Sequence, residues 1–334
     1  MTAEQVTRIM HSRWVLILIA LCVVPAAHFT FTHTVIDYVQ GDRGLLFPSA
    51  NLWIADRVTQ FWVNIAGTYV LAALMILINR QFNLLRTITL IDSSFFLLMS
   101  VSAPWLLVQF YTGTPLALTL LVCVFLLYST YADKHRRKRI FLLFAILSAM
   151  SMTQYCYLVF IPVFVIGTAQ MRIFSAKTLV AILLGLITPW WIVLGGGFAS
   201  VADIHVPAWG DMLSGFDFAE DFELLVTAVL TGVLLLTGWV LNFPKMIAYN
   251  AHMRAYNGLL SVLALFTLLA VFIDFTNMSA YMPVLFMCSA FYMGRMFAAN
   301  ASPRSYIAIM AIFATYILLY AWTLFYNLPE LAGV

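Results

Sequence analysis

Apolar segments of helix length recur along the whole chain, beginning with WVLILIALCVVPAAHFTF at residues 14–31. A helix needs about 20 apolar residues to cross a membrane, and in lipid the backbone must satisfy its hydrogen bonds within helices or closed barrels. Only 9% of the 334 residues are charged, whereas soluble domains carry about 25%, so this chain cannot cover itself with a polar surface. We therefore predict an all-α, polytopic transmembrane helical bundle.

The apolar segments predict about eleven spans. They cover residues 13–33, 60–78, 88–109, 115–131, 140–153, 156–171, 178–195, 223–242, 257–275, 279–297 and 304–325. The stretch 140–171 is too long for one crossing and tight for two, and we expect a shallow hairpin with its tip at Met152–Tyr155; one long tilted helix is the alternative. Since no polar stretch is long enough to bury a core of its own, residues 1–334 are expected to form a single transmembrane domain.

The basic residues predict an orientation. With the hairpin and alternating spans, every one of the 17 Lys and Arg residues except Arg43 and Arg57 falls on the side of the N-terminus. Cytoplasmic loops carry this excess, so we expect the N-terminus inside, the C-terminus outside, and a bacterial inner membrane as the location. A single helix over 140–171 would remove the bias.

Two segments on the inner side are basic. Residues 132–139, ADKHRRKR, are expected to contact anionic lipid and not nucleic acid. Residues 241–256, LNFPKMIAYNAHMRAY, are expected to form an interfacial helix. The bilayer is therefore the expected partner, while the oligomeric state stays open.

The acidic residues gather on the outer side, in loops 34–59 and 196–222. Thr30, His33, Thr34 and Asp37 have the spacing of one helix face. A carboxylate beside an imidazole suits a general base, whereas the plainer interpretation is a polar stripe where the helix meets water. Asp42 follows in the same loop.

Further polar residues of the first outer loop lie in NLWIADRVTQFW, residues 51–62. The helical spacing of this segment predicts a short interfacial helix anchored by Trp53 and Trp62. Asp56 and Arg57 would lie on it, either solvated or in contact with a substrate. The second outer loop adds Asp203 and His205, which could bind a divalent metal or a sugar, or lie on an amphipathic surface segment.

Polar residues within the apolar segments are a second group of candidates. Asp92 lies about one turn inside its span, where a carboxylate is costly and often functional; pairing with Arg80 or Arg86, or a network with Ser93 and Ser94, is the structural alternative. At the hairpin tip, Gln154, Tyr155 and Tyr157 predict a polar cluster at membrane depth, either beside a pocket or in a packed turn.

A first span that ends in an acidic outer loop, followed by tightly connected spans and a second large outer loop, resembles bacterial membrane glycosyltransferases of the C-type fold. The resemblance covers about residues 13–222 and rests on layout. It implies a polyprenyl-linked sugar donor and a catalytic carboxylate in the first outer loop, where Asp37, or next Asp42, stands. The chain also resembles uncharacterised bacterial inner-membrane proteins, for which no activity is implied.

The leading hypothesis is therefore a glycosyltransferase or glycan polymerase acting at the outer face. Asp37 would be the base and His33 would orient it, while Arg43 or Arg57 would hold the donor phosphate because guanidinium groups bind phosphate oxygens in pairs. Gln154 and Tyr155 would line the groove for the carrier. No resident cofactor is expected, although a divalent metal is left open. The alternatives are a transporter or flippase that uses Asp92, and a structural subunit that docks through 196–222.

Overall fold

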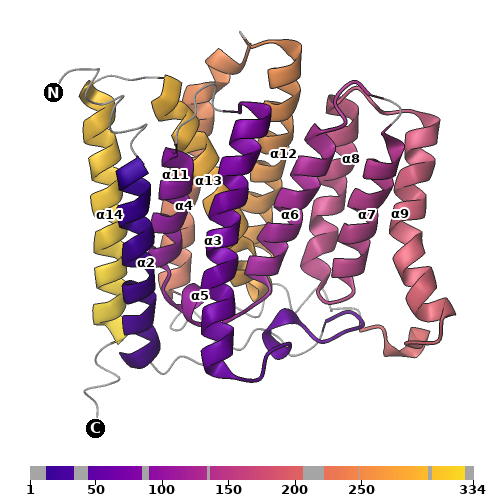
Figure 1. Ribbon diagram of the computed structural model, residues 1–334, viewed down its shortest axis with the longest axis horizontal. Helices are drawn as coiled ribbons and strands as arrows, with labels where there is room; N and C mark the ends of the chain where they lie inside the picture. The colour runs from indigo at the N-terminus through magenta and orange to yellow at the C-terminus, as the bar shows by residue number, and fades with distance from the viewer. Residues whose placement is uncertain are drawn as a thin grey trace.

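The computed structural model describes residues 13–33, 44–84, 90–133, 136–205, 222–247, 249–299 and 303–327. All regular elements in these ranges are helical, which confirms the predicted all-α class. The helices lie side by side, and consecutive long elements run in opposite directions (Figure 1). Asp37, Asp42 and Arg43 lie outside the described residues.

Six of the described helices are long and apolar enough to cross a membrane. They are α2 (Arg13–His33), α3 (Arg57–Phe82), α9 (Ala176–Gly195), α11 (Phe222–Ile247), α12 (Ala251–Ile273) and α14 (Pro303–Asn327). This number of apolar helices is compatible with a multi-pass membrane protein.

The other elements are shorter or less apolar. They are α4 (Ile91–Ser102), α5 (Trp105–Val108), α6 (Gly113–Tyr128), α7 (Arg137–Ser151), α8 (Ile161–Gln170), α13 (Met278–Ala299) and the 3-10 segments η1 (Ala50–Leu52), η2 (Tyr155–Phe160), η3 (Val201–Asp203) and η4 (Phe275–Asn277). The break predicted near Met152–Tyr155 is present, because α7 ends at Ser151 and η2 begins at Tyr155.

Three predicted segments need correction. The span expected over 88–109 is interrupted after Ser102, where Pro104 precedes the short helix α5. The interfacial helix expected over 51–62 is wrong: η1 ends at Leu52, and α3 begins at Arg57 with Asp56 as its N-cap. The interfacial helix expected over 241–256 is also wrong, since α11 extends to Ile247 and α12 starts at Ala251.

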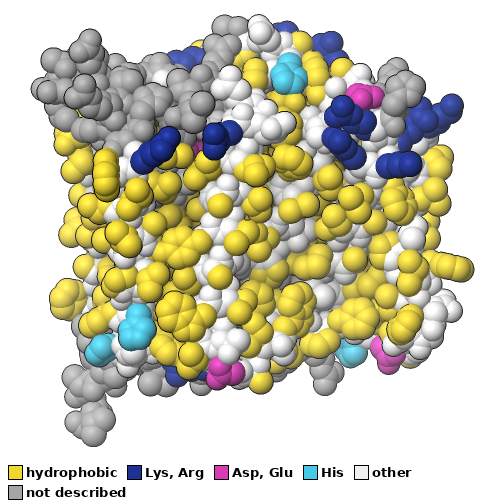
Figure 2. All heavy atoms as spheres, in the orientation of Figure 1, with side chains coloured by type: hydrophobic (Ala, Val, Ile, Leu, Met, Phe, Trp, Pro, Cys, Tyr) yellow, Lys and Arg dark blue, Asp and Glu magenta, His cyan; other side chains and the backbone are white. Residues whose placement is uncertain are grey.

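Most of the described basic residues gather at one end of the bundle. This end, called the basic end below, is where α2 begins and α3 stops, and it carries Arg80, Arg136, Arg139 and Lys177 among others. Arg57 lies at the opposite end. Figure 2 shows dark blue side chains along the basic end and an apolar band below it. Large apolar side chains in this band face outward, such as Trp191 at 71% and Leu318 at 68% exposure, as expected for a surface in contact with lipid.

The end of the short helix α5 is stabilised by a buried amide. The Nδ2 atom of Asn64, on α3, donates to the carbonyl oxygens of Leu106 at 2.6 Å and Leu107 at 3.1 Å. The hydroxyl of Thr114 donates to Asn64 Oδ1 at 2.5 Å. Carbonyls left free where a helix stops need such partners, because a buried polar group without a hydrogen bond is costly.

Replacing Asn64 with leucine is therefore expected to lower the free energy of unfolding by about 2 kcal/mol, since two buried carbonyls lose their donor. The midpoint of thermal unfolding in detergent measures the effect. Asn257→Leu is the matched control: Asn257 is equally buried, and its side-chain atoms have no hydrogen-bond partner among the described residues. Equal losses in both variants would contradict this role of Asn64.

Candidate functional site

Six polar side chains meet near the end of the bundle opposite the basic end. We call them the Asp274 cluster: Thr112, Gln154, Tyr155, Asp274, Asn277 and Tyr281. They come from three parts of the chain, namely the start of α6, the turn between α7 and α8, and the connection between α12 and α13 with the first turn of α13. All three are places where a helix starts or stops, so backbone groups there need polar neighbours.

Asp274 is the centre of the cluster. Tyr155 donates to its Oδ1 atom at 2.8 Å and Tyr281 to its Oδ2 atom at 2.9 Å. The amide of Asn277 donates to the Asp274 oxygens at 3.1 and 3.3 Å and to the Tyr155 hydroxyl at 2.5 Å. Only 5% of Asp274 is exposed. With its oxygens occupied by these donors, Asp274 is suited to hold the three segments together and not to accept a proton from a substrate.

The cluster extends through Gln154 toward α6. Gln154 Nε2 donates to Asn277 Oδ1 at 2.5 Å, and the Thr112 hydroxyl donates to Gln154 Oε1 at 2.9 Å. The expected polar cluster at the hairpin tip is thus present, and Gln154 and Tyr155 belong to it. In these contacts it resembles a packed turn more than the wall of a pocket.

The first loop joins the described structure on the same hairpin tip. The amides of Leu46 and Phe47 donate to the Met152 carbonyl at 2.8 and 3.0 Å, and the His205 amide donates to the Leu45 carbonyl at 2.9 Å. A Cβ atom on Gly44 would overlap the Thr153 carbonyl oxygen, so only glycine permits this approach. The first loop therefore lies against the turn that carries the Asp274 cluster, and the second loop contacts the first at Leu45.

His33 is turned back along its own helix. Its Nδ1 atom lies 2.9 Å from the Phe29 carbonyl oxygen and 2.8 Å from the Thr32 hydroxyl, and its ring stacks on Phe29 at 4.3 Å. Because Asp37 lies outside the described residues, the predicted contact between His33 and Asp37 stays a prediction.

Asp56 and Arg57 have local roles at the start of α3. The Asp56 carboxylate accepts hydrogen bonds from the Thr59 hydroxyl at 2.5 Å and the Thr59 amide at 2.8 Å, and these bonds lower the pKa of Asp56. The Arg57 guanidinium lies 5.1 Å from the centre of the Phe31 ring. Asp56 acts as a helix cap, so a substrate would have to compete with Thr59 for its carboxylate.

The acid and histidine of the second loop do not converge on one point. The Asp203 carboxylate accepts from the Ser200 amide at 2.8 Å, which lowers the pKa of Asp203. His205 Nδ1 instead lies 2.7 Å from the Asp203 carbonyl oxygen. Within the described ranges, no group of three or more His, Cys, Asp or Glu side chains is arranged to hold a metal ion.

Two ionisable side chains are buried inside the bundle near the basic end. Asp92 is 0% exposed and Arg295 is 2% exposed. Neither carboxylate oxygen of Asp92 and no guanidinium nitrogen of Arg295 has a hydrogen-bond partner among the described residues. The hydroxyls of Ser93 and Ser94 donate to the Ala72 and Leu90 carbonyls and not to Asp92.

Arg295 is a candidate that sequence reasoning missed, and its place explains why. It follows Gly294, where α13 approaches α4 so closely that a Cβ atom would lie 3.0 Å from the Cβ of Asp92. The Arg295 guanidinium faces the Tyr292 ring at 5.7 Å. In the sequence, Arg295 lies near the end of a predicted span, a position typical of a cytoplasmic arginine. Only the packing of α4 on α13 buries its side chain.

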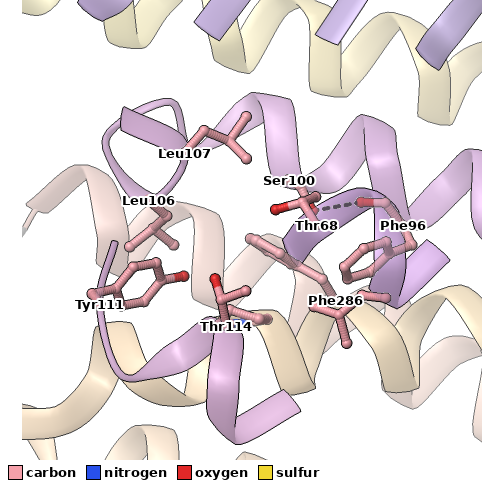
Figure 3. A pocket seen from close by; sticks show the side chains of 10 residues that line it. Thr68, Phe96, Ser100, Leu106, Leu107, Tyr111, Thr114 and Phe286 are labelled. Atoms are coloured by element: carbon pink, nitrogen blue, oxygen red, sulfur yellow. Dashed lines mark hydrogen bonds between the residues drawn. The ribbon is translucent and has the colours of Figure 1, made fainter. Parts of the chain in front are cut away.

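A small cavity lies next to the α4–α5 interruption. The space open to the centre of a water molecule is about 10 Å3, close to the minimum for one water. Figure 3 shows Tyr111 and Thr114 on one side of this space and Ser100 on the other. Its size suits a water molecule that serves local hydroxyls, and no substrate.

Comparison with known proteins adds no relative to this description. No family model matches the chain, and neither a curated protein nor a solved structure matches it significantly.

If the Asp274 cluster holds the three segments together, Tyr155→Phe should lower the free energy of unfolding by about 1–2 kcal/mol, since Asp274 loses a donor and Asn277 an acceptor. Thermal unfolding in detergent checks this value. Tyr306→Phe is the control, because Tyr306 is also half-buried but has no hydrogen bond to a described residue. A Tyr155→Phe protein as stable as the control would argue against the anchoring role.

Proposed function

We propose that the chain is a multi-pass protein of a bacterial inner membrane that transfers or polymerises sugars from a polyprenyl-linked donor at the outer face. In this proposal the helices make about eleven crossings, with the N-terminus in the cytoplasm. The gathering of basic residues at one end of the bundle supports this orientation, because positively charged loops stay in the cytoplasm.

The observation that carries the proposal is the attachment of the first loop to the hairpin tip. The loop with Asp37 and Asp42 joins the described structure at Gly44, beside Thr153. That turn is held in place by the Asp274 cluster. A catalytic carboxylate must be held within a fraction of an ångström of its productive position, which requires a rigid support. The cluster is suited to be such a support.

The proposed chemistry is the transfer of one glycosyl group. Asp37, oriented by His33, takes the proton of an acceptor hydroxyl, and Asp42 is the next candidate for this role. The hydroxyl oxygen then bonds to the anomeric carbon, and the bond from that carbon to the carrier phosphate breaks. The phosphate leaves on the carrier and keeps the electron pair. Arg43 and Arg57 bind the donor phosphate, and Asp56 caps the helix that begins at Arg57. Gln154 and Tyr155 support the hairpin tip as members of the Asp274 cluster.

Asp37→Asn is expected to lower the rate of lipid-linked glycan elongation by about 100-fold or more, because a positioned general base contributes at least that much. Membranes from cells that make each variant in place of the native protein would be assayed for elongation, at matched protein levels. Asp203→Asn is the control, since this outer carboxylate caps a local turn. Full activity of both Asp37→Asn and Asp42→Asn would refute the enzyme proposal.

A second candidate, a transporter or flippase, is favoured by the buried charges of Asp92 and Arg295. Intramembrane charges without partners are costly and are kept mostly where they serve ion or substrate movement. On this hypothesis Asp92→Asn abolishes uptake or flipping while Asp37→Asn has no effect. The enzyme hypothesis gives the reverse pattern, so the same pair of variants separates the two.

A further inference from the structure

The basic end of the bundle holds a cavity of about 530 Å3 between the ends of α3, α6 and α12. Its wall includes the aromatic residues Phe82, Tyr128 and Tyr256 and the basic residues Arg136, Arg139 and His252. The Asp274 cluster lies at the opposite end, so this cavity is separate from the site of the proposed function.

The cations of the cavity are held close to one another. Arg136 Nη1 donates to the Ser129 carbonyl at 2.6 Å, and Arg139 Nη1 donates to the same oxygen at 3.2 Å. Asp133 pairs with Arg136 Nε at 2.8 Å. A guanidinium has five N–H donors, so these contacts leave donors of both arginines available to an anion. Asp133 offsets one of the two positive charges, so one net positive charge remains to attract an anion bound between the guanidinium groups.

Most of the rest of the wall is aromatic. Tyr128 stacks on Tyr256 at 4.2 Å, and the Phe82 ring meets the edges of both at 5.3 and 5.5 Å. Tyr131 meets the His252 ring at 4.5 Å, and His252 Nε2 lies 2.6 Å from the Tyr256 hydroxyl. Ring faces offer apolar contact to a hydrocarbon chain. The hydroxyls of Tyr128 and Tyr256 donate to each other's backbone carbonyls at 2.9 and 3.1 Å, so the polar recognition in this cavity falls to the two arginines.

From these contacts we propose that this cavity binds a phosphate group, with Arg136 and Arg139 as its ligands. The ring wall favours a phosphate that carries an apolar chain, as in the headgroup of an anionic lipid, because chain and charge then meet complementary surfaces of one cavity. Guanidinium groups match phosphate oxygens in geometry as well as in charge.

Binding of phosphatidic acid to the purified full-length protein tests the proposal, with diacylglycerol of the same chains as the ligand that lacks the phosphate. Phosphatidic acid is expected to bind at least about tenfold more tightly, and the Arg136→Gln/Arg139→Gln protein to lose about that factor or more, since each charged hydrogen bond contributes roughly that much. Arg172→Gln/Lys177→Gln is the matched control: it removes the same charge from exposed residues at the same end outside the cavity.

A third measurement adds inorganic phosphate as a competitor of phosphatidic acid. It shows whether the phosphate group that binds belongs to a soluble compound or to a lipid. Competition by inorganic phosphate supports the site with a soluble phosphate compound as the ligand. Binding of phosphatidic acid without such competition supports it with a lipid. Equal affinity for phosphatidic acid and diacylglycerol overturns the proposal, as does equal loss of affinity in the two double variants. The midpoint of thermal unfolding without ligand verifies that each variant is folded. If the Arg136→Gln/Arg139→Gln protein is unstable, the single variant Arg139→Gln replaces it.

Discussion

The structure depends on one constraint: wherever the backbone leaves a helix inside an apolar bundle, its free polar groups need a partner. Asn64 binds the carbonyls where α5 ends, and the Asp274 cluster lies where the α7–α8 turn meets the α12–α13 connection. In both places an amide or carboxylate from a distant part of the chain takes the role that water has at a solvated loop. Polar side chains therefore fix which helices are neighbours, while apolar packing between α13 and the surrounding helices fills the space.

The two ends of the bundle satisfy their charges in different ways. At the end opposite the basic residues, Asp274 is surrounded by tyrosine and amide donors, and the first loop lies against the hairpin tip. At the basic end, arginines share a single carbonyl oxygen beside an open aromatic cavity. A closed polar network is suited to hold a loop in position, whereas an open cluster of cations is suited to attract an anion. This difference motivates the separate proposals for the two ends.

Asp92 and Arg295 do not follow the pattern of satisfied polar groups. Each is almost fully buried, and neither has a hydrogen-bond partner among the described residues. Asp92 lies in the first turn of α4, where the helix dipole stabilises negative charge, and the Arg295 guanidinium faces the Tyr292 ring. Buried charge without a partner lowers stability, so the pair has a cost for which the fold alone gives no physical reason.

The sequence by itself determined the class of the protein and most of its helices, because apolar length and periodicity are local properties. It also located the break between Ser151 and Tyr155, and the polarity of Gln154 and Tyr155 indicated the cluster there. It could not find Asp274, Asn277 or Tyr281 as their partners, or the cavity beside Arg136 and Arg139, because these residues meet across more than a hundred positions of chain. The burial of Arg295 and the role of Asn64 were likewise decided by tertiary structure, since a side chain's neighbours in a bundle depend on which helices pack together.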